Sequence, residues 1–452
     1  MSDIIAAIAT GRAPCAIGIL RLSGPGCAAL TGRVFTPKQP FADAPDRRLV
    51  LGLLHDRQGR VIDECLGVVC RAPHSYTGEE TVELQCHGSP AMLAAGLEAL
   101  LAAGARQAGP GEFTRRAFLN GKLDLTQAEA VVDLIDAETA DAAANAAGQL
   151  GGALKRAIEP VYDGLTDLCS QFHAVLDYPD EDIEDFGAAE LSGALDRAGV
   201  ALRELLATYE KGRHLRQGVR AVLLGKPNAG KSSLLNRLAG YDRVIVTDIA
   251  GTTRDTVEEP VRVGRVLLRL TDTAGIREAG DAIEALGVAR SEQAAREAEL
   301  ALFVCDASQS LTDEDRRAIE AAKCAPRSLA LCNKSDLPAA AVSPDELPFD
   351  TVLTVSARTG AGLDALPAVL EGWFLGENAC DGSLLTNPRQ FGALDRASRA
   401  IERAKAGLSL GVTPDAVLTD VEESMAALGE VTGRTVREDI TNRIFERFCV
   451  GK

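Results

Sequence analysis

A glycine-rich loop between an apolar run and a helical run constrains the chain more than any other feature. The loop reads Gly225-Lys226-Pro227-Asn228-Ala229-Gly230-Lys231-Ser232, and the apolar run Ala221 to Leu224 precedes it. Glycines let backbone N–H groups turn inward around phosphates, and the following helix adds its positive end. The order of strand, loop and helix therefore predicts a phosphate-binding loop, in which Lys231 reaches the outer phosphates and Ser232 offers its hydroxyl to magnesium.

A second motif follows the strand-like run Val266 to Leu270 and reads Asp272-Thr273-Ala274-Gly275. Its carboxylate is suited to hold magnesium through water, and the Gly275 N–H to sense the terminal phosphate. The next residue is Ile276. A glutamine that orients water is therefore not expected at this position, and another group must do that work.

Two further motifs predict which base is bound. Asn333-Lys334-Ser335-Asp336 follows the strand-like run Leu329 to Leu331, and Ser356-Ala357-Arg358 follows Val352 to Val355. The two oxygens of Asp336 can accept from the ring N–H and the amino group of guanine, whereas adenine would leave the carboxylate unpaired. The Ser356-Ala357-Arg358 turn is expected to supply a backbone donor near the guanine oxygen. GTP is therefore favoured over ATP.

The alternation of textures predicts several domains in the 452 residues. The first 118 or so residues indicate a small α/β domain. Helical spacing begins after Gly121, where Thr126-Gln127-Ala128-Glu129 has the form of a capping box opening a long helix. Strand-like and helical runs alternate from 219 to about 372, and helical spacing returns from Gln390. We expect a helical domain in two segments with a Ras-like α/β domain inserted between them.

Composition narrows the classes of partner and the location. No apolar run is long enough to cross a bilayer, and the start of the chain has no basic segment ahead of a long apolar core, so we expect a cytoplasmic protein without a secretory signal. A net charge of -17 argues against coating nucleic acid, so any RNA contact must be local. The eleven cysteines are scattered and the closest pair, Cys65 and Cys70, lacks the spacing of metal or redox pairs, which favours reduced, mostly buried thiols.

Several long stretches of the chain are distinctive: Ile19 to Gly24, Ser75 to Glu79, Glu83 to Gln85, His87-Gly88, Arg116 to Asp124, Gly225 to Ser233, Thr247 to Asp255 and Phe448 to Lys452. Together these stretches resemble one family, the tRNA-modifying GTPases called MnmE or TrmE. The resemblance implies a tetrahydrofolate-binding and dimerisation domain at 1–120, a helical domain at 121–217 and 376–452, and the G domain at 218–375.

The resemblance also implies how hydrolysis is activated. Two G domains of a homodimer would meet across their nucleotides, with a potassium ion held by Asn228, Thr247, Ile249 and Thr252. Thr253 would join Ser232 on magnesium, and Glu284 would orient the attacking water. The catalytic set is then Glu284, Lys231 and Gly275. Motifs and resemblance together assign the following residues to GTP: Asn228, Ala229, Gly230, Lys231, Ser232, Ser233, Thr247, Asp248, Ile249, Ala250, Gly251, Thr252, Thr253, Asp272, Thr273, Ala274, Gly275, Asn333, Lys334, Asp336, Ser356, Ala357 and Arg358.

For the N-terminal domain the resemblance implies a folate pocket at the dimer interface. Arg21, Glu83, Lys122 and Lys452 match its positions and would hold 5-formyltetrahydrofolate or methylene-tetrahydrofolate. Cys449 matches the family's C-terminal cysteine and is a possible nucleophile. The chain departs from the family at Val450, at Ser89 after His87-Gly88, and in a glycine-poor stretch near its start, which bears on folate binding more than on the family.

The implied function is modification of the wobble uridine of certain tRNAs. An FAD-binding MnmG (GidA) partner would join the homodimer in a heterotetramer, and together they would add a carboxymethylaminomethyl or aminomethyl group at C5. Two alternatives stay open: an RNA- or ribosome-binding assembly GTPase of the Era or Der type, and a structural partner whose nucleotide only controls dimer shape. The single phosphate loop and the lack of a Gly-x-x-Gly RNA clamp weigh against the assembly-factor reading.

Overall fold

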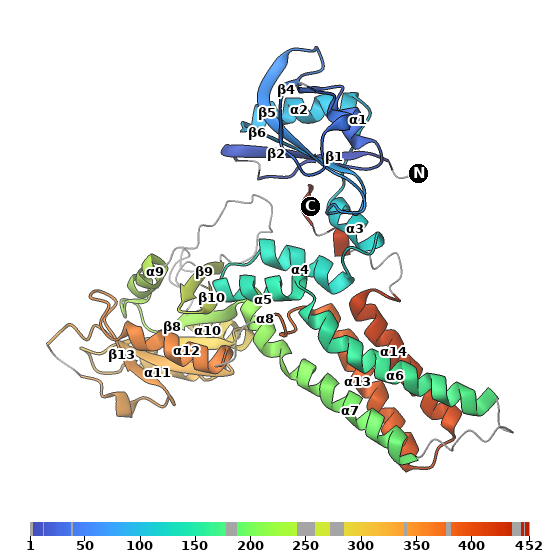
Figure 1. Cartoon of the computed structure of the whole chain (residues 1–452). Coiled ribbons are helices and arrows are strands. Elements are labelled where there is room, and N and C mark those ends of the chain that lie inside the picture. Colours follow the sequence, from blue (N-terminus) through green and yellow to red (C-terminus); the bar gives the residue numbers. More distant parts are fainter. Residues whose placement is uncertain are drawn as a thin grey trace. The chain divides into compact units, whose positions relative to one another are not determined.

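The computed structural model describes most of the chain, and its contacts divide it into two compact units. The described residues are 3–11, 13–37, 39–177, 188–241, 258–271, 284–338, 341–376, 381–435, 444–446 and 448–451. The first unit comprises Met1–Val132, Leu150–Leu195 and Arg399–Lys452. The second comprises Asp133–Gln149 and Asp196–Ser398. Figure 1 colours the chain along its sequence.

A seven-stranded sheet with the order β3-β4-β5-β6-β2-β1-β7 opens the first unit. Its strands are β1 Ile5–Ile8, β2 Cys15–Ser23, β3 Phe35–Pro37, β4 Val50–His55, β5 Val61–Cys70, β6 Thr81–Gly88 and β7 Arg106–Gln107. All neighbours are antiparallel except β1 and β7. The helices beside it are α1 Cys27–Thr31, α2 Pro90–Ala102 and α3 Glu112–Leu119, with a short η1 turn at Phe41–Asp43.

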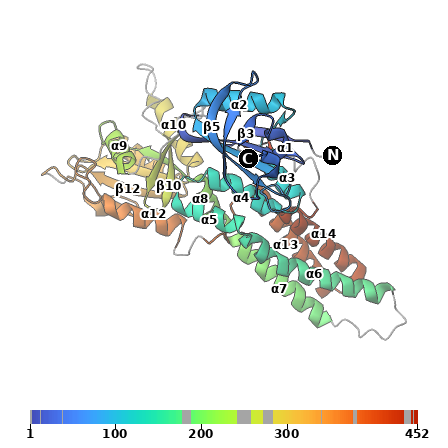
Figure 2. The same ribbon diagram turned by 45° about the horizontal axis from the view of Figure 1, so that its top comes forward.

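Alternation along the central strands gives this sheet an apolar face and a polar face. On β6, Val82, Leu84 and Cys86 are buried, and Leu84 shares a core with Leu93 of α2, which lies across the strands (Figure 2). Side chains alternate between the two faces of a strand. Glu83 therefore belongs to the opposite face, where the register sets it against Arg21 of β2.

Helix α4, Leu125–Ile135, begins two residues earlier than its sequence pattern indicated, so the predicted capping box at Thr126 and Glu129 is wrong. Asp124 Oδ1 accepts from the Gln127 N–H at 2.9 Å, and Gln127 Oε1 accepts from the Asp124 N–H at 3.0 Å. A carboxylate and an amide three residues apart satisfy the same two backbone donors as the expected pair. The expected long helix is also wrong, because α4 ends at Ile135 and α5 Ala140–Leu150 follows.

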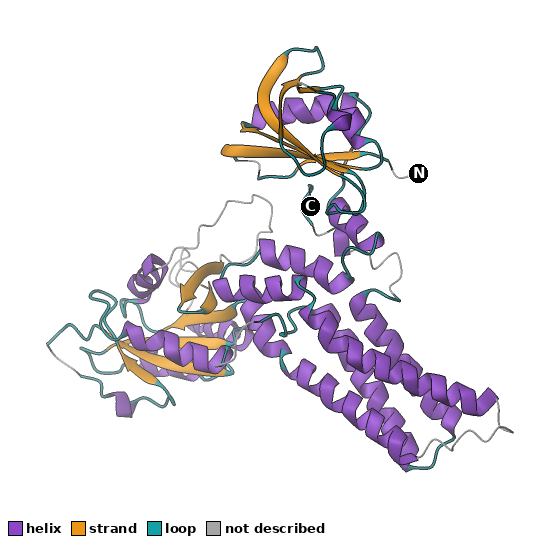
Figure 3. Cartoon of the chain, viewed as in Figure 1, coloured by secondary structure: helices purple, strands orange, loops and turns teal. Residues whose placement is uncertain are grey.

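The remaining helices of the first unit come from two separate parts of the sequence. Helix α6, Ala153–Asp177, packs along α14, Pro414–Thr432 (Figures 1 and 3). Within the same unit Arg403, on α13 Pro388–Ser409, donates to Asp420 of α14 at 2.8 Å. Helix α7, Ala188–Ala207, belongs to both units, since the division falls after Leu195. Helix α13 is divided in the same way after Ser398.

The second unit holds a six-stranded sheet in the order β13-β12-β11-β8-β10-β9, parallel except for β9 against β10. Its strands are β8 Val219–Leu224, β9 Glu258–Val263, β10 Val266–Thr271, β11 Leu300–Asp306, β12 Arg327–Asn333 and β13 Val352–Thr354. Its helices are α8 Tyr209–Gln217, α9 Lys231–Tyr241, α10 Glu284–Glu297, α11 Asp313–Ala322 and α12 Leu366–Phe374, with short η2 and η3 turns at Pro344–Glu346 and Leu363–Ala365.

Two apolar cores sandwich this second sheet. One core joins the sheet to α8, α9 and α12, and the other joins it to α10 and α11. β11 is buried at all seven positions, as expected of a parallel strand covered on both faces. In such sheets ligands bind beyond the carboxyl ends of the strands. The phosphate loop after β8 and the guanine motif after β12 therefore leave the sheet at the same edge.

The stretch from 211 to 220 is basic, and its arginines contact acids of the same unit. Arg216 contacts Asp133 at 2.8 Å, and His214 lies 3.0 Å from Glu299. Burial disfavours the Glu299 carboxylate, but hydrogen bonds from His214 and Arg213 outweigh burial and lower its pKa to about 2. The stretch therefore anchors α8 to the sheet.

The predicted fold class is confirmed: an N-terminal α/β domain, a discontinuous helical domain and an inserted Ras-like α/β domain. The four predicted residue ranges of the domains stay predictions, since the division of the chain into two compact units is coarser. In the described part of the chain no helix is both long and apolar enough to cross a membrane.

Candidate functional site

The phosphate loop has backbone angles that favour glycine and asparagine at three of its positions. Gly225 and Gly230 have φ of 143° and 98°, and Asn228 has φ of 62°. A Cβ on Gly225 would lie 2.1 Å from the Val304 carbonyl oxygen, and one on Gly230 would lie 2.1 Å from Asn333 Nδ2. Both glycines are therefore required by conformation and by space.

The ammonium group of Lys231 contacts the backbone of the phosphate loop. Lys231 begins α9, and its Nζ donates to the Gly225 and Lys226 carbonyl oxygens at 2.7 and 2.8 Å. Ser232 and Ser233 are exposed in the first turn of α9. An ammonium group, two hydroxyls and a helix N-terminus thus meet at the loop, which is the arrangement that phosphate and magnesium require.

Asn333 is the first residue of the predicted guanine-binding motif Asn333-Lys334-Ser335-Asp336. It joins the phosphate loop to the turn Ser356-Ala357-Arg358. Its side chain, 2% exposed, donates from Nδ2 to the Ala229 carbonyl oxygen at 2.9 Å. Its Oδ1 accepts from the Ala357 N–H at 2.9 Å. The Ala357 N–H is one of the backbone donors of the turn that we expect near the guanine oxygen, and Asn333 engages it in this structure.

Lys334 stands beside this clamp. It has φ of 66°, and its Nζ contacts Asp306 Oδ2 at 2.7 Å. Burial favours neutral Asp306, but Lys334 and Ser308 donate to the carboxylate and hold its pKa below the usual value. The pair fixes the loop from which Asp336 projects.

The carboxylate of Asp336, which the sequence predicts to select the base, has a pKa below its usual value. Ser356 Oγ donates to Asp336 Oδ1 at 2.6 Å, and Arg358 lies 3.6 Å from Oδ2. The Ser356 hydrogen bond is the main cause of a lowered Asp336 pKa, with a smaller contribution from Arg358. The structure therefore brings together the predicted Lys231, Ser232, Asn333, Asp336 and Ser356.

The other predicted nucleotide and metal ligands lie outside the described residues. They are Thr247, Asp248, Ile249, Ala250, Gly251, Thr252, Thr253, Asp272, Thr273, Ala274 and Gly275. Glu284 begins α10, but its side chain also lies outside the description. Their roles stay predictions.

A second polar cluster lies on the face of the N-terminal sheet opposite α2. Arg21 Nε donates to Glu83 Oε1 at 2.8 Å, as the register of β2 and β6 requires. The Arg21 guanidinium also lies 5.7 and 5.8 Å from the ring centroids of Tyr76 and Phe113. Sequence reasoning singled out neither ring as a site residue, although Tyr76 belongs to the Ser75 to Glu79 stretch.

The C-terminal segment reaches the same cluster. Val450 bridges to Pro110, and the Gly451 carbonyl oxygen accepts from Arg21 at 3.4 Å. Gly451 has φ of 101°, and a Cβ there would lie 2.4 Å from the Ile8 carbonyl oxygen. The segment thus fits closely against β1. Lys452 lies outside the described residues.

Other predicted residues of this domain have ordinary surroundings. Cys449 is exposed, and its carbonyl oxygen accepts from the Gly111 N–H at 3.3 Å. Lys122 Nζ donates to the Pro73 carbonyl oxygen at 3.2 Å. Ser89 has φ of -72° and ψ of 124° at the start of α2, so its backbone conformation accommodates a residue with a side chain.

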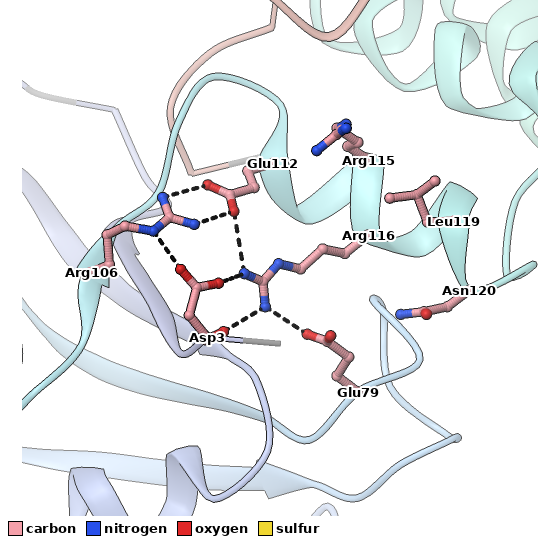
Figure 4. Close-up of a pocket in the computed structure, with 8 residues that line it drawn as sticks. All are labelled: Asp3, Glu79, Arg106, Glu112, Arg115, Arg116, Leu119 and Asn120. Atoms are coloured by element: carbon pink, nitrogen blue, oxygen red, sulfur yellow. Dashed lines mark hydrogen bonds and ion pairs between the residues drawn. The ribbon is translucent and has the colours of Figure 1, made fainter. Parts of the chain in front are cut away.

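A charged cavity of about 320 Å³ in the N-terminal domain was not predicted (Figure 4). Arg116, 9% exposed, donates to Asp3 at 2.6 Å and to Glu79 at 2.9 Å. Arg106 donates to Asp3 and Glu112, each at 2.6 Å, and mainly the Arg106 hydrogen bond lowers the pKa of Asp3 to about 2. These acids and guanidinium groups compensate one another, and they tie the start of the chain to α3.

Comparisons with known proteins agree over the whole chain. A family model described as GTP-binding protein TrmE N-terminus matches residues 4–122, and one described as MnmE helical domain matches residues 125–449. A tRNA modification GTPase MnmE of Roseiflexus sp. (strain RS-1) is 45% identical over 462 residues, covering 100% of this chain and 99% of the relative. Proteins with the same name from Symbiobacterium thermophilum and Aquifex aeolicus are 44% and 41% identical over 100% of this chain and 99% and 100% of theirs. The chain belongs to the MnmE family of tRNA modification GTPases.

Proposed function

We propose that this protein hydrolyses GTP to support modification of the wobble uridine of certain tRNAs. One observation carries the nucleotide part: Asn333 joins the phosphate loop to the loop that holds an ionised Asp336. Family membership supports the tRNA part.

Guanine is selected by the Asp336 carboxylate. Ser356 already occupies one lone pair of Oδ1, and an ionised carboxylate has further lone pairs for the ring N–H and the amino group of guanine. Adenine offers no such pair of donors. The unpaired carboxylate costs several kcal/mol, which corresponds to a preference of about a hundredfold to ten-thousandfold.

The phosphate loop fits the triphosphate for a related reason. Lys231 now donates to two loop carbonyl oxygens, and phosphate oxygens are stronger acceptors for the same ammonium group. Ser232 and Thr253 would hold magnesium, with Asp272 acting through water. When bound, magnesium offsets the charge that develops on the phosphates.

Hydrolysis in this proposal depends on two copies of the G domain. Asn228, Thr247, Ile249 and Thr252 would hold a potassium ion that supplies positive charge where another GTPase uses an arginine. Glu284 would orient the attacking water, since Ile276 has no polar group for this task. The left-handed backbone of Asn228 and its exposed side chain are compatible with such a ligand.

The N-terminal domain would bind a one-carbon tetrahydrofolate as 5-formyl or methylene derivative. Arg21 offers a guanidinium, Glu83 offers an acceptor for pterin donors, and the exposed Tyr76 ring offers a surface on which a flat heterocycle can pack. Lys122 and Lys452 would hold the glutamate tail. In the Arg21–Glu83 pair the Arg21 side chain is 19% exposed and the Glu83 side chain is 29% exposed, so both remain accessible to a ligand.

The proposed partners are a second copy of the chain, an FAD-dependent MnmG-type protein in a heterotetramer, and tRNA, all in the cytoplasm. Together they would add a carboxymethylaminomethyl or aminomethyl group at C5 of the uridine. Because the net charge is -17, contact with tRNA must be confined to local basic patches or to the partner.

Nucleoside analysis of tRNA from cells that lack the gene tests the function. The modified wobble uridines should disappear and should return with the wild-type gene but not with a Lys231→Ala variant. Unchanged wobble uridines in the deletion strain would refute the tRNA role, whatever the protein does with GTP.

The cation requirement is tested on purified protein by replacing potassium with sodium at equal ionic strength. Hydrolysis should be faster in potassium, whereas the affinity for a fluorescent GDP analogue should stay the same. Glu284→Ala should slow hydrolysis far more than it weakens GTP binding. Equal rates in the two salts would exclude the potassium mechanism and leave guanine binding intact.

A further inference from the structure

Two buried cysteines face each other across strands β5 and β6. These strands are antiparallel with Leu66 opposite Gln85. One step further along this register, Cys65 lies opposite Cys86, and the two sulfurs lie within 4.8 Å of each other. Each residue is 3% exposed. The proximity of the two sulfurs is therefore a product of strand register rather than of spacing along the chain.

A carboxylate completes a three-ligand group. Asp63 lies two residues before Cys65 and hence on the same face of β5. Its side chain is 7% exposed. One carboxylate oxygen of Asp63 and the sulfurs of Cys65 and Cys86 all lie within 4.8 Å of one another. Among the described residues this is the group that brings three such donors together.

His87 holds the carboxylate from the solvent side. Its backbone N–H donates to Asp63 Oδ2 at 2.8 Å, and its ring Nδ1 lies 2.7 Å from Asp63 Oδ1. The His87 side chain is 80% exposed, so the cluster is buried but next to the surface. Carboxylates that ligate a metal are themselves held by hydrogen bonds from neighbouring groups, and His87 makes such contacts with Asp63.

We propose that Asp63, Cys65 and Cys86 bind a zinc-class divalent cation, with His87 positioning the carboxylate. Two sulfurs and one carboxylate suit zinc, whereas magnesium and calcium prefer oxygen ligands alone. Tetrahedral zinc bonds of about 2.0 to 2.3 Å place ligand atoms about 3.3 to 3.8 Å apart, so the side chains must move by only about 1 Å. Both thiols release their protons to solvent as the metal–sulfur bonds form.

A bound cation would cross-link β5 to β6, next to the turn that leads into α2, and would have a structural role independent of the nucleotide site.

Cobalt is a suitable probe, because cobalt–thiolate complexes absorb visible light whereas zinc–thiolate complexes do not. Full-length reduced protein is stripped with a chelator without oxygen and titrated with Co²⁺. A thiolate-to-cobalt charge-transfer band should saturate at one equivalent, and Zn²⁺ but not Mg²⁺ should abolish it. A stripped wild-type protein that gives no such band overturns the proposal.

Matched variants locate the site. Cys65→Ser and Cys86→Ser should abolish the band, whereas Cys70→Ser, on the same strand as Cys65, should keep it. His87→Ala, an exposed change that spares the core, should weaken zinc binding by about 10- to 100-fold. A band unaffected by His87→Ala and by both serine variants would overturn the assignment, as would a Cys65–Cys86 disulfide in protein isolated without oxygen. GTP hydrolysis, measured after Mg²⁺ is added back, should not change in the stripped protein, so this test is separate from that of the proposed function.

Discussion

Replacing Asn333 with alanine tests whether its side chain couples the two halves of the nucleotide site. The change removes the donor to the Ala229 carbonyl oxygen and the acceptor of the Ala357 N–H. Ala229 and Ala357 are 0% and 8% exposed, so water does not readily replace these bonds. Each buried group left unpaired costs about 1 to 3 kcal/mol, which gives about 2 to 6 kcal/mol in total.

This free energy is divided between two measurable quantities. Part lowers the free energy of unfolding of the nucleotide-free protein. The rest lowers the affinity for GTP, because binding must then order two uncoupled loops, and every 1.4 kcal/mol or so corresponds to about tenfold in the dissociation constant. We therefore expect Asn333→Ala to weaken binding by at least about tenfold and to lower the midpoint of thermal unfolding.

Titration with a fluorescent GDP analogue and thermal unfolding without nucleotide measure the two parts. Asn236→Ala, an exposed asparagine on α9, is the matched control and should change neither. Asn333→Asp keeps the acceptor for Ala357 but sets a carboxylate against the Ala229 carbonyl, so it should be at least as damaging. Wild-type affinity and stability in Asn333→Ala would refute the reasoning, because the clamp would then contribute nothing.

Three further outcomes follow from single contacts. Asp336→Asn exchanges one acceptor for a donor. Competition binding should therefore show a loss of the preference for guanine nucleotides and a relative gain for xanthine nucleotides. An unchanged preference would contradict the assigned contact with the base. The pKa of Glu299 is about 2 in the folded protein, against an ordinary value of 4.5. The stability that this carboxylate contributes at neutral pH should therefore fall as the pH drops below about 5. Denaturant titrations of Glu299→Gln should show a smaller fall, and an identical pH profile would contradict this. Gly451→Ala would place a Cβ 2.4 Å from the Ile8 carbonyl oxygen, so folate retention after gel filtration should drop while GTP hydrolysis stays unchanged; normal retention would separate the C-terminal segment from the folate site.

Local signals predicted the backbone conformation of the phosphate loop. The phosphate loop depends on consecutive residues, since glycine and asparagine permit the left-handed backbone at Gly230 and Asn228. The helix start at α4 was less predictable. Thr126 and Asp124 both can cap a helix, and the structure uses Asp124 because Gln127 returns the second hydrogen bond.

The sequence by itself determined the family, the fold class and the order of the nucleotide motifs, because each is written in contiguous residues with local conformational preferences. Only the tertiary structure decided that Asn333 joins Ala229 to Ala357 and that Arg21 meets Gly451. Likewise, the closest cysteines in sequence, Cys65 and Cys70, are not the pair that meets. Strand register sets Cys65 against Cys86, and register depends on long-range pairing that no short stretch of sequence specifies.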